Sequence, residues 1–159
     1  MNALIVYYTG TGNTEMVAKN LEAVLKSRGH TVAVNKMSSR GVARSFLGKG
    51  YQALFGRPLK PEGVALDVSG FELICIGSPV WAGNAAPPVK GYILECTGMK
   101  GKDVILFLTY GGAPGVRGLV KKLTKMLEMK EPASIRTVYF SARDLKFPEK
   151  VMNRFKEMI

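Results

Sequence analysis

Residues 3–14 read ALIVYYTGTGNT, an apolar run that passes directly into a loop of glycine, threonine and asparagine. The run Ala3–Tyr8 predicts a strand covered on both faces, as in a parallel sheet packed between helices. Residues 14–28 then carry apolar side chains on one helical face, and Gly29 follows where helices commonly end. This strand, glycine-rich turn and helix together favour an α/β fold.

The same alternation continues along the chain. Apolar runs predict further strands, and apolar residues at a 3.6-residue spacing predict further helices. Strands that alternate with helices indicate βαβ crossovers and therefore a doubly wound parallel sheet with helices on both faces. The predicted strands are Glu72–Gly77, Val104–Thr109, Thr137–Ser141 and the weaker Thr31–Asn35, and the predicted helices follow Pro87, span Gly118–Met129 and follow Pro148.

Length and composition bear on domain number and location. A chain of 159 residues, 47% of them apolar, can build one sizeable core, so we expect a single domain over residues 1–159. No apolar run approaches the ~20 residues that span a bilayer, and no signal-peptide pattern precedes Leu4, so we expect a cytoplasmic protein. Cys75 and Cys96 are expected as buried or semi-buried thiols without a disulfide.

The formal net charge of +11 is concentrated in two parts of the chain. Residues 117–159 carry 11 basic and 5 acidic side chains, and residues 38–66 carry 5 and 1. A basic surface favours acidic partners or polyanions, whereas a scattered, solvated charge is the plainer interpretation.

Residues 38–66 interrupt the alternation, because they stand where a second helix belongs and yet contain several glycines and prolines. Two interpretations remain open. The segment is either a glycine-weakened helix packed on the sheet or an amphipathic segment that lies on a membrane surface or a partner. Both depend on an apolar stripe made by Ala43, Phe46, Leu47, Tyr51, Leu54 and Phe55.

The loop Thr9-Gly10-Thr11-Gly12-Asn13-Thr14 stands between the first strand and the first helix. Its glycines allow close backbone approach, its hydroxyls can donate hydrogen bonds, and the N–H groups of a helix start favour a phosphate. The loop lacks the lysine of GxxxxGK[ST] and the spacing of GxGxxG, so nucleoside triphosphate hydrolysis is disfavoured. A purely structural turn is the alternative.

Two further glycine-rich segments follow predicted strands. Ser78-Pro79-Val80-Trp81-Ala82-Gly83-Asn84 follows the third strand and holds the single tryptophan, which could stack on a planar cofactor or plug the core. Thr109-Tyr110-Gly111-Gly112-Ala113-Pro114-Gly115 repeats the pattern after the fourth strand. Since ligands bind at the carboxyl ends of strands in open α/β sheets, we expect the three loops to converge on one ligand.

No other constellation indicates catalysis. His30 is the single histidine and is expected at the surface, and no CxxC, clustered metal ligands or GxSxG motif occurs. No catalytic side chain and no metal site are predicted, so a cofactor would have to carry any reaction.

With these motifs the sequence resembles the flavodoxin family, over nearly the whole chain. TGTGNT is similar to that family's phosphate loop, and SPVWAG and TYGG are similar to its two flavin loops. The resemblance implies FMN as cofactor, a five-stranded sheet of order 2-1-3-4-5 and the short form of the family. Two features depart from familiar members, because this chain is basic and its third loop lacks an acidic residue.

The resemblance also implies which residues hold the cofactor. Residues 9–14 would bind the FMN phosphate, residues 79–83 would line the isoalloxazine ring, and residues 109–112 would close its other side. The expected cofactor-binding residues are Thr9, Gly10, Thr11, Gly12, Asn13, Thr14, Ser78, Pro79, Val80, Trp81, Ala82, Gly83, Asn84, Thr109, Tyr110, Gly111, Gly112 and Gly115.

The function that this resemblance implies is low-potential transfer of single electrons between redox partner proteins. We expect those partners to have acidic docking surfaces, with no nucleic acid, no stable membrane insertion and a monomer or weak dimer. The alternative is an NAD(P)H-dependent quinone or nitro-compound reductase that contains FMN, because residues 79–84 also resemble that branch. A flavin sensor whose basic surface holds a polyanion is a third possibility.

Overall fold

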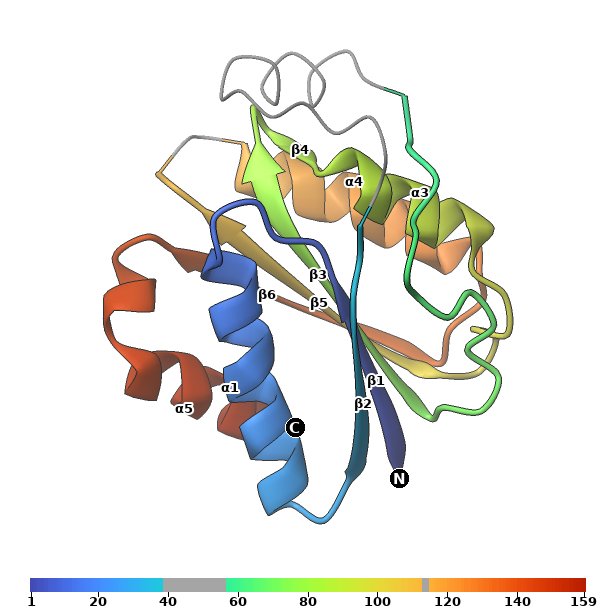
Figure 1. The fold of residues 1–159 in the computed structure, drawn as a ribbon, viewed down its shortest axis with the longest axis horizontal. Helices are drawn as coiled ribbons and strands as arrows, with labels where there is room; N and C mark the ends of the chain where they lie inside the picture. Colours follow the sequence, from blue (N-terminus) through green and yellow to red (C-terminus); the bar gives the residue numbers. More distant parts are fainter. Residues whose placement is uncertain (39–56, 113–114) are drawn as a thin grey trace.

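The computed structural model describes residues 1–38, 57–112 and 115–159. Within these residues, five long strands form a parallel sheet of order β2-β1-β3-β5-β6 (Figure 1). A short strand, β4, pairs antiparallel with the end of β3. β4 pairs only with β3 and lies outside the row of long strands. When the five long strands are numbered by themselves, their order is 2-1-3-4-5, so the predicted order is confirmed. The strands are β1 (Asn2–Tyr7), β2 (Thr31–Lys36), β3 (Leu73–Trp81), β4 (Asn84–Ala85), β5 (Asp103–Tyr110) and β6 (Ser134–Ser141).

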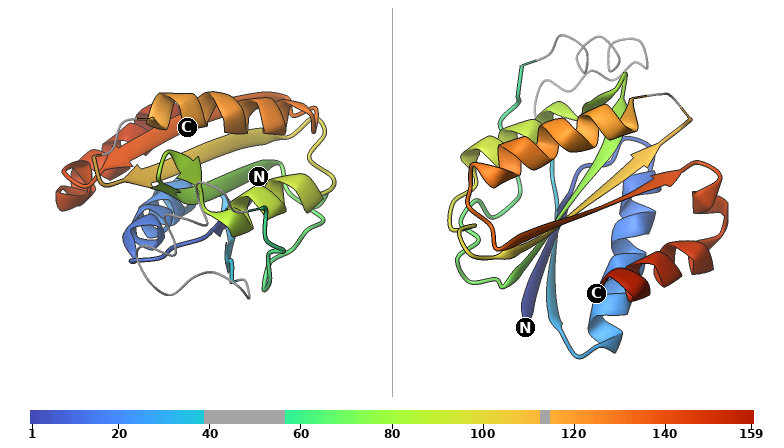
Figure 2. Two further views of the ribbon diagram at one scale, coloured as in Figure 1. Left: turned by 90° about the horizontal axis from the view of Figure 1, so that it is seen from above. Right: turned by 180° about the vertical axis from the view of Figure 1, so that it is seen from behind.

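Helices cover both faces of the sheet, as Figures 1 and 2 show. α1 (Asn13–Ser27) and α5 (Pro148–Met158) lie together on one face, and α5 follows a short 3-10 turn, η1 (Asp144–Lys146). α3 (Pro87–Glu95) and α4 (Val116–Glu128) lie on the other face. The predicted doubly wound α/β architecture is therefore confirmed.

Alternate residues of the strands enter two separate apolar cores. In β1, Ile5 packs in the cluster that includes Leu21 of α1 and Phe155 of α5. Its neighbour Leu4 packs in the other cluster, with Ile93 of α3 and others. Both faces of the strand are thus fully buried, which explains why the strands read as continuous apolar runs rather than as alternating patterns.

Two predicted strand boundaries differ from the structure by more than one residue. β3 runs to Trp81 rather than ending at Gly77, because Ser78 and Pro79 still pair with β5 and the last two residues pair with β4. β6 begins at Ser134 rather than at Thr137. β6 is an edge strand whose first residues are half-buried, so polar side chains are tolerated at its start. These side chains interrupt the apolar run, and the sequence pattern therefore does not show where the strand begins.

The basic segment 38–66 is described only in part. Its predicted apolar stripe lies outside the described residues, whereas residues 57–66 have no helix. This stretch is held to its surroundings by backbone hydrogen bonds, including Leu59 N–H to Pro87 O at 3.1 Å and an antiparallel bridge between Ser38 and Glu62. It therefore runs across α3, where the Leu59 carbonyl lies against Gly91.

The remaining composition-based expectations concern the cysteines and membrane spans. Cys75 and Cys96 are buried free thiols, as predicted, and burial raises the pKa of both. His30 is half-buried in the turn after α1, deeper than expected. Among the described helices, none combines the length and apolar character that crossing a membrane would require.

A carboxylate fastens the end of β6 to α5. Asp144 Oδ2 accepts hydrogen bonds from the N–H and the hydroxyl of Ser141, both at 2.8 Å, and Asp144 Oδ1 pairs with Lys150. The hydrogen bond from Lys150, the largest cause, and those from Ser141 lower the pKa of Asp144 to about 2.

Replacing this carboxylate should therefore destabilise the protein above pH 4. A folded-state pKa below the usual value means that the stabilisation is present above pH 4 and is lost as the pH falls toward 2. We expect Asp144→Asn to lower the free energy of unfolding at pH 7 by up to about 2 kcal/mol. Urea unfolding at pH 7 and pH 2.5 tests this, with the exposed neighbour Glu149→Gln as control. A loss that is equal at both pH values would contradict the assignment.

Candidate functional site

The structure brings the three glycine-rich segments together at the carboxyl edge of the sheet. A buried hydrogen bond joins Thr14 Oγ1 and Thr109 Oγ1 at 2.9 Å, and so links the first segment to the third. Gly115 lies against the tip of the second, since a Cβ atom on it would be 3.5 Å from the Cα of Gly83. The ends of β1, β3 and β5 thus surround one region.

The first segment leaves the start of α1 without a side-chain cap. Gly12 is the N-cap residue and adopts a left-handed conformation with φ of 91°, which glycine reaches at little cost. The Thr9 hydroxyl accepts the N–H of Gly12 at 3.0 Å and so fixes the turn. Because no side chain caps the helix, the backbone N–H groups at its first turn face outward with the positive end of the helix dipole. This arrangement suits an anion.

A carboxylate close to this helix start is neutralised by lysines. Glu15, in the first turn, pairs with Lys36 at 2.8 Å and with Lys19 at 3.4 Å. The hydrogen bond from Lys36, followed by that from Lys19, lowers the pKa of Glu15. The two lysines therefore offset the repulsion that Glu15 would exert on a bound anion.

The second segment is a hairpin rather than the predicted loop. Ser78, Pro79, Val80 and Trp81 belong to β3, and Asn84 belongs to β4. The two residues between the strands, Ala82 and Gly83, have φ of 47° and 74°, the pattern of a tight type I′ turn.

Ser78 holds the base of this hairpin. Its buried hydroxyl donates to Pro79 O at 2.8 Å and accepts the N–H of Ala86 at 3.1 Å. The hydroxyl thus has both of its partners within the protein. Ser78 therefore holds the shape of the hairpin and does not offer its hydroxyl to a ligand.

Trp81 lies half-buried at the end of the hairpin. Its ring meets that of Tyr8 edge to face, with centroids 5.6 Å apart and planes at 88°. The indole packs against the core and is partly exposed, which agrees with a core role in part, whereas stacking on a cofactor stays a prediction. A planar ligand could stack on its exposed side.

The third segment offers a second aromatic ring and the start of a second helix, which no described side chain caps. Tyr110, at the end of β5, is half-buried and its ring lies 6.1 Å from that of Tyr139. Gly111 and Gly112 are exposed, and Gly115 is the N-cap residue of α4 with φ of 112°. Residues 113 and 114 lie outside the described residues.

Sequence reasoning missed two residues that support these rings. Tyr8 was assigned to the first strand, but β1 ends at Tyr7 and leaves Tyr8 free to turn toward Trp81. Tyr139 comes from the edge strand β6. An aromatic residue at the junction of a strand and a glycine loop was the available signal for Tyr8, whereas only the sheet order could reveal Tyr139.

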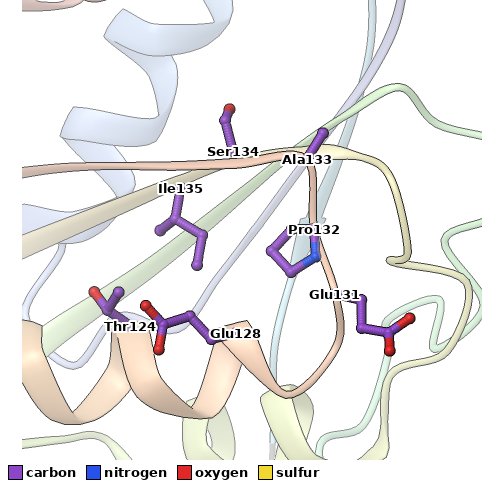
Figure 3. A pocket seen from close by; sticks show the side chains of 7 residues that line it. All are labelled: Thr124, Glu128, Glu131, Pro132, Ala133, Ser134 and Ile135. Carbon is purple, nitrogen blue, oxygen red and sulfur yellow. The ribbon is translucent and has the colours of Figure 1, made fainter.

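A surface hollow lies at the opposite end of the sheet and is separate from these loops. Figure 3 shows Thr124 and Glu128 of α4 beside Ile135 of β6, with the Glu131 carboxylate pointing away. Glu131 pairs instead with Lys100 at 2.5 Å. The hollow is a gap between a helix and an edge strand, and no predicted site residue lines it.

Comparison with known proteins places the fold. No family model and no curated protein matches the sequence. Among solved structures, a flavoprotein from Lactobacillus acidophilus in complex with FMN is 20% identical, with 86% of this chain and 92% of that chain covered and a TM-score of 0.68. The oxidised flavodoxin 2 of Bacillus cereus is 20% identical over 100% of both chains, with a TM-score of 0.65. The chain has the flavodoxin-like fold.

A third solved structure is similar to this chain over nearly its whole length. The two-electron reduced flavodoxin of Megasphaera elsdenii is 20% identical, with 98% of both chains covered and a TM-score of 0.61. The flavodoxin-like fold was predicted from three loops that now lie at one edge of the sheet. The fold expected from the sequence is confirmed.

The bond between Thr14 and Thr109 can be tested by a double-mutant cycle. Thr109→Val keeps the shape of the side chain but leaves the buried Thr14 hydroxyl without this partner, so we expect a loss of about 1–3 kcal/mol in unfolding free energy. Adding Thr14→Val should recover much of that loss. Urea unfolding of both single variants and the double variant gives the coupling energy, and additive losses would show that the two hydroxyls do not interact.

The hairpin turn offers a matched pair of substitutions. A left-handed conformation costs a non-glycine residue roughly 1 kcal/mol, and a Cβ at Gly83 would meet no atom within 4 Å. We therefore expect Gly83→Ala to lower the unfolding free energy by about 1 kcal/mol through the backbone alone. Ala82→Gly should be neutral or slightly stabilising. Thermal unfolding of both variants checks the opposite signs, and equal destabilisation would show that the turn geometry differs.

Proposed function

We propose that this chain binds FMN at the carboxyl edge of its sheet and carries single electrons between redox proteins at low potential. The observation that carries the proposal is the convergence of an uncapped helix start with two half-buried aromatic rings, Trp81 and Tyr110, at that edge. A protein of the same fold, the Lactobacillus acidophilus flavoprotein, is described in complex with FMN.

The phosphate end of FMN fits the first segment. Gly10, Thr11 and Asn13 are exposed there, and the segment holds no cationic side chain. Binding of a dianionic phosphate would thus rely on backbone N–H groups, on hydroxyls and on the helix dipole. Thr11 is the exposed hydroxyl of the segment, whereas the Thr14 hydroxyl is buried and already bonded to Thr109.

The flavin ring fits between the second and third segments. When bound, FMN would supply the redox chemistry. Trp81, fixed by Tyr8, and Tyr110, fixed by Tyr139, would shield the ring from water. Gly83 and Gly115 approach each other closely where the two segments meet, and neither has a side chain that would fill the space between them.

The carrier is favoured over the reductase by the aromatic residues at the site. If Trp81 and Tyr110 cover the ring, little room is left for a nicotinamide to lie on it. We further propose that the protein works in the cytoplasm, because both cysteines are free thiols, as is usual in a reducing compartment.

The proposal is tested by loading the purified chain with FMN and titrating it anaerobically with a reductant. A carrier should take up its two electrons in separable one-electron stages and should oxidise NADPH negligibly with a quinone acceptor. A single two-electron stage with rapid NADPH oxidation would support the reductase instead. Failure to bind FMN would refute both.

Thr11→Ala should separate phosphate binding from ring binding. Loss of a hydrogen bond to a charged group costs ~1.5–3 kcal/mol, so we expect FMN affinity to fall by roughly 10- to 150-fold while riboflavin affinity changes little. Fluorescence titration of both flavins measures this. Thr97→Ala, an exposed threonine after α3, serves as control. Equal weakening of FMN and riboflavin would show that Thr11 does not contact the phosphate.

A further inference from the structure

We propose that the exposed face of α4 is a docking surface for acidic redox proteins. This inference rests on the proposed electron-carrier function and names the partner. The surface consists of four exposed cations, called here the α4 basic stripe: Arg117, Lys121, Lys122 and Lys125.

The charges of the α4 basic stripe repel one another. Arg117, Lys121 and Lys125 follow at intervals of four residues, so they form one row along the helix. Like charges at this spacing destabilise a helix by a few tenths of a kcal/mol per pair. In the part of the chain that the structure describes, none of the four stripe cations forms an ion pair.

The helix α1 shows the contrasting arrangement. There Lys19 pairs with Glu15 at 3.4 Å, and Lys26 pairs with Glu22 at 2.7 Å, each at an interval of four residues. On this surface helix, both lysines are therefore paired with glutamates of the same helix. The α4 basic stripe is left unbalanced, so its charge is available to a partner.

The position of Arg117 lowers the stability of α4 further. It lies in the first turn of α4, next to the positive end of the helix dipole, where cations are disfavoured. That turn contains no acidic residue, whereas the first turns of α1 and α5 contain Glu15 and Glu149. A charge pattern that works against helix stability is expected where a surface serves recognition.

The positive field extends to the neighbouring helix. Lys90 of α3 is half-buried, and burial, together with the charge of Lys122, lowers its pKa. α3 and α4 lie side by side on the same face of the sheet (Figures 1 and 2). At least one further cation, Lys90, therefore lies close enough to the stripe to feel its charge.

The stripe begins at the proposed flavin site. α4 starts directly after Gly115, which lies against Gly83 at the hairpin tip, and its 13 residues extend for about 20 Å away from that point. A partner that lies along the stripe would reach the flavin edge with one end. One helix face suits the small, transient interfaces of redox encounters.

The chemistry of α4 favours an acidic protein over a membrane or a nucleic acid. The apolar row of the helix, Leu119, Leu123 and Leu127, is buried in the core, so these side chains are not available for insertion into a bilayer. The helix also carries no aromatic residue on which a base could stack. What remains is spaced positive charge, which complements spaced carboxylates.

The test uses the FMN-loaded chain and an acidic [2Fe–2S] ferredoxin as the probe. Stopped-flow mixing with the reduced ferredoxin gives the rate constant of electron transfer at low and high salt. We expect Lys121→Glu with Lys125→Glu to slow the reaction by about tenfold or more at low salt and much less at 0.5 M salt. The matched control, Lys146→Glu with Lys156→Glu, makes the same change of net charge at exposed positions on the other face.

The outcomes separate docking from cofactor binding. FMN affinity should be unchanged in both double variants, since neither alters the three loops. If the chain fails to bind FMN, the proposed function falls, and docking is then read from NMR shifts of α4 on titration with the oxidised ferredoxin. Equal slowing by both double variants, no shifts on α4, or tighter binding of an oligonucleotide or of anionic vesicles than of ferredoxin would overturn the docking proposal.

Discussion

Burial of both faces of the parallel sheet is the constraint on which the rest of the molecule depends. Ile5 and Leu4 of β1 point into opposite cores, and each core is closed by its own pair of helices. The middle of the sheet is therefore apolar on both sides and has little capacity to bind a polar ligand. Groups that can do so are left at the strand ends, where chain direction reverses into helices. The location of the site is thus a consequence of packing.

Two helices, α1 and α4, begin at this same edge with similar N-caps but with different charges around them. Gly12 and Gly115 are both N-cap residues in a left-handed conformation, and among the described residues no side chain caps either helix. The start of α1 is followed by a carboxylate that lysines neutralise, so the local field suits one small anion. The start of α4 is followed by four cations before its one carboxylate, Glu128, so positive potential is spread over a larger surface. One edge of the sheet can therefore hold a cofactor and face a macromolecule.

The sequence predicted the fold well because the central strands β1, β3 and β5 are buried on both faces, and their continuous apolar runs indicate that burial directly. It failed where structure depends on pairing. Val80 and Trp81 continue β3 only because β4 turns back beside them, and a two-residue strand has no pattern of its own. It placed the loops at one edge, yet it could not show that Thr14 bonds to Thr109 across 95 positions of sequence. Contacts of this kind follow from sheet order rather than from local composition.

Gly91 has a consequence for how such a chain can change over time. Glycine within a helix is unfavourable by roughly 0.5–1 kcal/mol relative to alanine, and here it lies in α3 where the carbonyl group of Leu59 occupies the place of a Cβ atom. The missing side chain is what allows residues 57–61 to cross the helix. Drift at position 91 is therefore coupled to the route of a segment 30 residues earlier. A related chain with a side chain at position 91 must also have a different path for residues 57–61. Changes at position 91 and changes in that segment should therefore occur together.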